Sequence, residues 1–214
     1  MDNPQGTITD LELGWLAGII DGEGTIAFSV YSRDDSKPEW VRVKPQVLVT
    51  GTEKLVIERA VELMRKLGAG AHFQTREQRD PRGFQSADRY KPLHVATAAG
   101  FKRSAAILRV IIPHLFSVKR QKAEMVLSYI DQRLAKTAVD HKAPHDREDL
   151  ALVVSIVKFS IENSSKGPKS KHLKWLNGLL NEQEQRATSG AKMCSELMRE
   201  HEKPAEMTGS PAGP

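Results

Sequence analysis

The nine residues LAGIIDGEG occupy positions 16–24 and end an apolar segment. Thr9 and Glu12 stand three residues apart just before that segment, which is the spacing of a capping box and predicts the start of a helix. Gly22 and Gly24 are typical of the end of a helix. Because the predicted helix is apolar on nearly every side, one neighbouring element cannot cover it.

Two carboxylates, Asp21 and Glu23, stand at the C-terminal end of this helix. The helix dipole makes that end negative, so each carboxylate is disfavoured there by roughly 0.3–1 kcal/mol. A divalent cation such as Mg²⁺, bound by carboxylate and peptide oxygens, would compensate. The alternative is that Asp21 and Gly22 form only a turn that ends the helix, and the local sequence favours neither interpretation.

Two glycines inside the helix indicate a close neighbour. Gly14 and Gly18 each destabilise a helix by about 1 kcal/mol relative to Ala, but they leave one face open to another backbone. If the neighbour is the same helix of a second copy, a two-fold axis brings both Glu23 side chains together. Two such acidic centres would suit two scissile phosphates on opposite DNA strands. The residues predicted for this dimer interface are Leu13, Gly14, Ala17 and Gly18.

The rest of the chain predicts an α+β fold. Strands are predicted at residues 25–32, 41–50, 71–78 and 90–97, and helices at 53–67, 102–115, 119–134, 147–163 and 173–200. Pro45 favours an edge position or a bulge in the second strand. We expect residues 1–134 to form a core, residues 135–202 a helical extension, and residues 203–214 a disordered tail.

Composition and charge narrow the class of protein. The single cysteine, Cys194, excludes a disulfide framework and a cysteine-based zinc site, so we expect an intracellular, reducing compartment. No apolar run approaches the roughly 18 residues of a membrane span, and the first twenty residues contain no Lys or Arg to begin a signal peptide. Residues 25–135 contain 20 basic and 11 acidic residues, a net charge of +9. This excess indicates a polyanionic partner, unless it is only a solvated basic face.

The stretch LAGIIDGEG resembles the LAGLIDADG signature of the homing endonucleases, with Glu23 in place of the last aspartate, a variation that the family commonly shows. The resemblance extends from about residue 11 to residue 134. It includes the order of the elements, the run VTGT at 49–52 before a long helix, and KRQKA at 119–123 at the start of a late helix. It implies the αββαββα homing-endonuclease fold, with an antiparallel, saddle-shaped sheet and additional C-terminal helices.

The resemblance also implies catalytic residues. Glu23 would be the acidic metal ligand of the active site, and Gly22 would supply its backbone carbonyl. Asp21 would position the helix end, and Lys119 would be the basic residue of the catalytic pocket, although a solvated lysine at a helix start is the alternative. The implied cofactor is Mg²⁺, with Mn²⁺ or Ca²⁺ able to occupy the same site. Gly51 stands near where family members often have Gln or a similar side chain, which is a departure from the pattern.

Double-stranded DNA would be bound by the polar faces of the strands, because a two-stranded ribbon fits the major groove and every second side chain points toward the bases. For Tyr31 and His72 the alternative is packing in the core or at its rim. The candidates for DNA contact are Ser29, Tyr31, Arg33, Arg42, Lys44, Gln46, Thr50, His72, Gln74, Arg76, Gln78, Arg89 and Lys91.

The motif occurs once in the chain, and one motif provides half of an active site. The expected protein is therefore a homodimer that hydrolyses both strands of a long, near-palindromic DNA target and leaves short 3′ overhangs, encoded within a mobile element. Two other functions stay open: an RNA-binding intron maturase, and a DNA-binding regulator that has lost cleavage. The presence of both Glu23 and Lys119 favours the nuclease.

Overall fold

The structure is a computed structural model that describes residues 7–32, 41–77, 91–136, 144–163 and 173–185. The elements confirm the predicted α+β order. They are α1 (Asp10–Gly22), β1 (Gly24–Ser32), β2 (Val41–Gly51), α2 (Lys54–Lys66), β3 (His72–Arg76), β4 (Leu93–Ala99), α3 (Phe101–Ile111), the 3-10 helix η2 (Ile112–His114), α4 (Val118–Lys136), α5 (Arg147–Glu162) and a last helix at residues 173–185.

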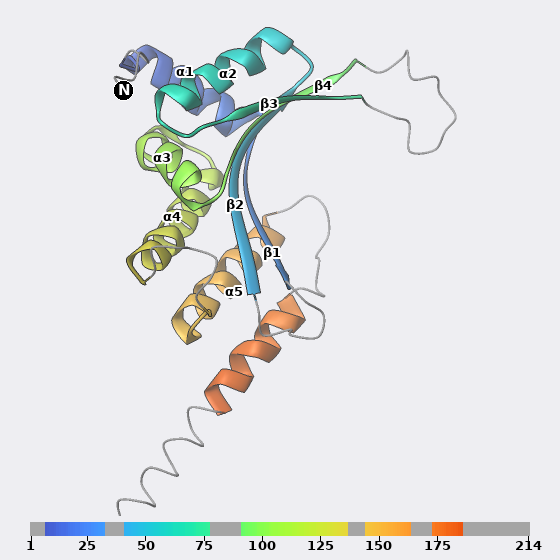
Figure 1. The fold of residues 1–214 in the computed structure, drawn as a ribbon, viewed down its shortest axis with the longest axis vertical. Helices are drawn as coiled ribbons and strands as arrows, with labels where there is room; N and C mark the ends of the chain where they lie inside the picture. Colours follow the sequence, from blue (N-terminus) through green and yellow to red (C-terminus); the bar gives the residue numbers. More distant parts are fainter. Residues whose placement is uncertain (1–6, 33–40, 78–90, 137–143, 164–172, 186–214) are drawn as a thin grey trace, which may run out of the picture.

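The four strands form one antiparallel sheet in the order β1-β2-β4-β3. Figure 1 shows that the strands curve strongly and that α1, α2, α3 and α4 lie on one side of the sheet. The predicted alternation of β2 is confirmed. Val47 and Val49 on one face are fully buried, whereas Lys44 on the other face is exposed.

Pro45 lies in β2, an inner strand between β1 and β4. At this residue only β1 forms a strand pair with β2. β4 pairs with β2 from Gln46 to Gly51, and Gly100, which follows β4, donates its backbone N–H to the carbonyl of Pro45 at 2.9 Å. The nitrogen and oxygen of one strand residue point to the same side. The missing N–H of Pro45 therefore faces the side on which β4 has already ended.

Helix α1 begins at the predicted capping box. Glu12 N–H donates to the hydroxyl of Thr9 at 3.2 Å, and Thr9 N–H donates to the Glu12 carboxylate at 2.9 Å. The same carboxylate accepts from Arg59 at 2.7 Å and Lys66 at 2.8 Å, both on α2. One acidic residue thus caps α1 and attaches it to α2.

The buried face of α2 includes most of the apolar positions at helical spacing, among them Ala60, Leu63 and Met64, but not the first two. Leu55 and Val56 belong to an apolar pattern at helical spacing, but Leu55 is 80% exposed and Val56 37% exposed. The side chains that pack into the core are those of Ile57, Ala60, Val61, Leu63 and Met64. Packing of the whole chain thus decides that Leu55 and Val56 stay outside the buried face.

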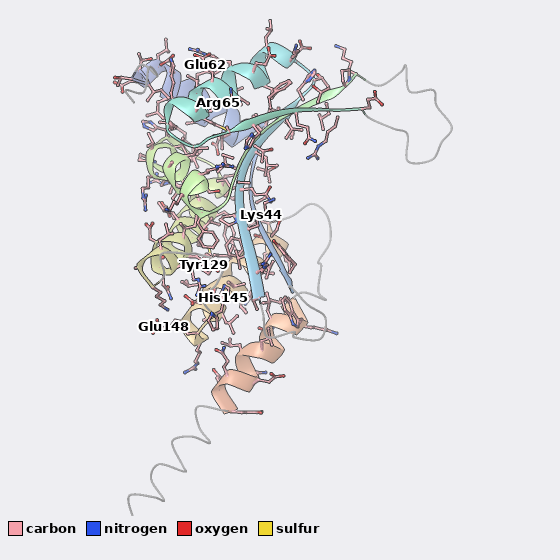
Figure 2. All side chains as sticks on the ribbon, viewed as in Figure 1. Lys44, Glu62, Arg65, Tyr129, His145 and Glu148 are labelled. Carbon is pink, nitrogen blue, oxygen red and sulfur yellow. The ribbon has the colours of Figure 1, made fainter. Side chains whose placement is uncertain are left out.

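The core continues from α4 into α5 and the last helix. Arg133 of α4 and Asp149 of α5 form an ion pair at 2.8 Å, with both side chains 1% exposed. Tyr129 and His145 share a buried hydrogen bond at 2.6 Å, and Figure 2 shows these two side chains where α4 meets α5. The C-terminal part of the predicted 173–200 helix and the predicted tail at 203–214 lie outside the described residues. Within the described ranges, no helix is long and apolar enough to cross a membrane.

Candidate functional site

The C-terminal end of α1 is bound by a lysine from α4. The ammonium of Lys119 donates to the carbonyl oxygens of Ile20 at 3.1 Å, Asp21 at 2.6 Å and Gly22 at 3.2 Å. A lysine ammonium has three donors, so these carbonyls use all of them. They are among the last carbonyls of the helix, which have no partner within it. Lys119 therefore caps α1 across a separation of 97 to 99 residues along the chain.

Asp21 connects the same helix end to the start of α4. Its carboxylate accepts from the backbone N–H groups of Phe116 and Ser117, both at 3.2 Å, and from the Ser117 hydroxyl. Burial raises the pKa of Asp21, but these hydrogen bonds and the charge of Lys119 outweigh it and hold the pKa below its ordinary value. The carboxylate thus stabilises the N-terminal end of α4, where the helix dipole favours negative charge.

These contacts compensate for negative charge at the C-terminal end of α1. The compensating groups present in the chain are the ammonium of Lys119 and the N-terminal end of α4. Asp21 is engaged within the chain. Glu23, by contrast, is exposed directly after α1, with its backbone N–H donating to Ile19 at 2.9 Å.

The structure explains why the motif has glycine at position 24. A Cβ at Gly24 would lie 2.6 Å from backbone atoms of Ile20, which is closer than real Cβ atoms come. Only glycine lets β1 begin against the last turn of α1. The exposed carboxylate of Glu23 is therefore held at a tight junction between α1 and β1.

Two lysines of α4 have lowered pKa values. Burial lowers the pKa of Lys119, and the charges of Asp21 and Glu23 oppose that shift only in part. Lys122 lies one turn further along α4, and burial lowers its pKa as well. Lys122 was not among the predicted site residues. Its position in KRQKA was the available signal, because residues i and i+3 share a helix face.

The oxygens at the end of α1 suit a hard cation, but one chain offers few of them. The carboxylate of Glu23 and the carbonyl of Gly22 have the chemistry that Mg²⁺ prefers. Among the residues that the structure describes, no group of three or more His, Cys, Asp or Glu side chains could hold a metal ion.

One face of α1 is open. A Cβ at Gly14 or Gly18 would have nothing within 4 Å, and the neighbouring Leu11 is 84% exposed. Leu13 is half-buried against the core. Ala17 is 1% exposed, so its side chain is already covered by the chain's own core. The open face is formed by Leu11, Gly14, Trp15 and Gly18.

The predicted DNA-contacting residues of the strands share the face of the sheet that lies opposite the helices. Residues paired across an antiparallel ladder project to the same side, and the register pairs Ser29 with Lys44 and Tyr31 with Arg42. Val95 pairs with both Thr50 and Gln74, which places β2 and β3 residues on that side as well. We call this surface the polar sheet face, and its predicted members are Ser29, Tyr31, Arg42, Lys44, Gln46, Thr50, His72, Gln74 and Arg76. Arg33, Gln78 and Arg89 lie outside the described residues.

Some of these side chains have partners within the chain. Arg76 donates to the amide oxygen of Gln74 at 3.2 Å. Lys91, which precedes β4, lies 3.9 Å from the Glu53 carboxylate, and both side chains are largely exposed. Such exposed contacts contribute little, so the side chains stay available to a ligand.

Sequence reasoning missed the segment that joins η2 to α4. Ser117 binds Asp21, and the adjacent Phe116 is 90% exposed beside it. The local sequence contains no motif for this contact, because Asp21 precedes it by more than 90 residues.

At Gly51, where a polar side chain was expected, an added Cβ would lie 3.4 Å from the side chain of Ile57.

Comparison with known proteins finds the fold among solved structures. No protein-family model matches the chain, and no curated protein sequence matches it significantly. The archaeal intron-encoded homing endonuclease I-Vdi141I, solved in complex with DNA, is similar over 79% of this chain and 97% of its own, at 15% identity and a TM-score of 0.52. The LAGLIDADG homing endonuclease I-GzeII, in complex with its DNA target, is similar over 76% of this chain and 47% of its own, at 13% identity and a TM-score of 0.51.

Proposed function

We propose that this chain, which has the fold of the LAGLIDADG homing endonucleases, is a site-specific endonuclease that cuts double-stranded DNA. The observation that carries the proposal is the meeting of Lys119 with the helix end that presents Gly22 and Glu23. A lysine can stabilise charge on a phosphate, and a peptide carbonyl and an exposed carboxylate can hold a metal ion, so groups suited to phosphodiester hydrolysis lie in one place. They lie where β1, a strand of the polar sheet face, begins.

We propose Mg²⁺ as the cofactor, held by the Glu23 carboxylate and the Gly22 carbonyl of each chain together with oxygens of the partner chain and of the DNA. Mn²⁺ or Ca²⁺ would suit the same oxygen ligands. The chemistry that such a metal would supply is activation of the attacking water and stabilisation of the leaving oxygen. Exposure of Glu23 supports this role, because the other motif acid, Asp21, is engaged with α4.

Lys119 would stabilise the charge that develops on the scissile phosphate. All three of its donors are on carbonyls of α1, so at least one hydrogen bond must be released for contact with a phosphate oxygen. Asp21 acts as a positioning residue, because it holds the start of α4 and hence the backbone that carries Lys119.

We further propose that the active form is a homodimer that meets through the open face of α1. The exposed glycines allow two helices to approach closely, and Leu11 and Trp15 add apolar area beside them. Each chain contributes one Glu23, so two chains are needed for two strands. A two-fold axis then implies a near-palindromic target, and short 3′ overhangs follow from the family resemblance.

The polar sheet face would bind the major groove. Its amides and guanidinium groups can form bidentate contacts to base edges, Gln with adenine and Arg with guanine. Lys44 is exposed near the centre of β2, as Figure 2 shows, and suits a backbone phosphate. The DNA-bound states of I-Vdi141I and I-GzeII support duplex DNA as the partner.

The test is a binding and cleavage assay with Glu23→Gln. The duplex target, selected from a randomised library cut by the wild-type protein in Mg²⁺, should bind the variant with near wild-type affinity and stay uncut. Glu58→Gln, which removes an exposed carboxylate of α2, is the matched control and should cut normally. Normal cleavage by Glu23→Gln would remove Glu23 from the chemistry. Stronger binding of structured RNA than of duplex DNA would favour a maturase instead.

A further inference from the structure

A pocket of about 400 Å³ lies at the sheet edge, where α2 ends and β3 begins. Its side-chain lining is basic: Arg65 from α2, His72 from β3 and Arg103 from α3 contribute, and no acidic residue of the described ranges does. The rest of the lining is the turn formed by Gly68, Gly70 and Ala71. A cavity with this lining has the chemistry of an anion site.

Both arginines of the pocket have guanidinium nitrogens available for a ligand. Arg65 donates from Nε to the carbonyl of Ala71 at 2.9 Å, which fixes the guanidinium and leaves its terminal nitrogens for a ligand. Arg103 approaches the Nε2 of His72 at 3.3 Å. Within the part of the chain that the structure describes, neither arginine forms an ion pair with a carboxylate. Two guanidinium groups and an imidazole thus line one pocket without internal neutralisation.

The turn makes room for Arg103. Gly70 has φ +54°, which side chains other than glycine rarely adopt, and a Cβ there would lie 3.2 Å from the Nε of Arg103. Ala71 beside it is buried, which anchors the turn to the core. The backbone is therefore shaped so that the guanidinium lies against it.

We propose that this pocket binds one phosphodiester group of the DNA backbone. The inference rests on the proposed function, since it supplies a contact that DNA binding would use. His72 pairs in register with Thr97 and lies on the polar sheet face at the edge strand β3. When a sheet face occupies the major groove, its edge lies near the sugar-phosphate backbone that borders the groove. His72 therefore serves a phosphate rather than a base edge.

The planar guanidinium groups suit this ligand. Arginine presents several N–H donors in a fixed geometry that matches two phosphate oxygens at once. A phosphate contact adds affinity and orients the duplex without reading its sequence. The pocket would thus contribute equally to target and non-target binding.

The experiment measures how DNA affinity depends on salt for Arg103→Gln. Loss of one phosphate contact reduces the slope of log K against log salt concentration by about 0.9, and by about twice that in a homodimer with two pockets. The affinity should fall by a similar factor for target and random duplexes. Lys102→Gln is the matched control, because Lys102 is the preceding exposed residue of α3, carries the same charge and lies outside the pocket.

Each result decides the inference. A smaller slope for Arg103→Gln and an unchanged slope for Lys102→Gln support it, whereas equal changes in both variants, or none in Arg103→Gln, overturn it. If the wild-type protein binds no duplex at all, the proposed function fails, and the pocket is then judged by inorganic phosphate alone. A rise in melting temperature with phosphate, relative to chloride of equal ionic strength, that Arg103→Gln loses would retain the anion site. Absence of that rise would overturn it.

Discussion

The ammonium of Lys119 lies 2.6 Å from the carbonyl oxygen of Asp21, a residue 98 positions earlier in the chain. The same motif acid accepts hydrogen bonds from the start of α4, the helix that carries Lys119. Each helix thus stabilises the end of the other: a cation on the C-terminal carbonyls of α1, and a carboxylate on the N-terminal amides of α4. The candidate catalytic residues are positioned by this reciprocal arrangement.

Lys119→Met should destabilise the protein as well as impair cleavage. Methionine keeps the approximate length of the side chain but removes the ammonium that three helix-end carbonyls share. We expect the free energy of unfolding, measured by urea denaturation, to fall by about 1–3 kcal/mol. Lys158→Met, which removes an exposed lysine of α5, is the control. An equal loss of stability in both variants would contradict the capping role.

Stability should depend on the ionisation of Glu12 at acidic pH. The hydrogen bonds from Lys66 and from the backbone of Thr9 lower the pKa of Glu12 from 4.5 to about 2. A carboxyl with a depressed folded-state pKa stabilises the fold above its unfolded-state pKa, and this contribution is lost as pH falls. We therefore expect urea midpoints to decrease between about pH 4.5 and pH 2, and less steeply in Glu12→Gln. Identical pH profiles for the two proteins would disprove the linkage.

Gly18→Leu should dissociate the proposed dimer without unfolding the chain. The space beside Gly18 is empty within one chain, so leucine fits there, but it obstructs a second α1. We expect sedimentation velocity to show monomers and the helical content to be retained. Gly178→Leu is a matched control, because Gly178 is also an exposed helical glycine with nothing within 4 Å of an added Cβ. If the Gly18→Leu variant dimerises as strongly as the wild-type protein, the interface lies elsewhere.

Asp149→Asn should strongly destabilise the junction of α4 and α5. It leaves the charge of Arg133 buried without its carboxylate, and removing one partner of a buried pair typically costs about 3–5 kcal/mol. Asp131→Asn disrupts the exposed pair with Arg109 and should change stability by no more than about 1 kcal/mol. Thermal or urea denaturation of both variants measures the difference. Similar small effects would show that α5 does not depend on the buried pair.

Local sequence predicted the elements and the motif because the interactions that form them are local. The capping box of Thr9 and Glu12 joins residues three apart, and the alternation of β2 reflects the two faces of a single strand. The exposed carboxylate of Glu23 and the carbonyl of Gly22 belong to one short motif. Each of these features depends only on residues close together in the sequence, so the sequence is enough to predict it.

Tertiary structure alone decided which sides of these elements face the core and which distant residues meet. Helix α1 is apolar on nearly every side, so only packing shows that Ala17 is buried and Gly14 exposed. The pairing of Lys119 with α1, and the convergence of Arg65 and Arg103 on one pocket, join segments whose separation in sequence encodes no distance in space. The physical reason is that a repeat of hydrophobic residues indicates a buried face, whereas the partner of that face is chosen by the packing of the whole chain.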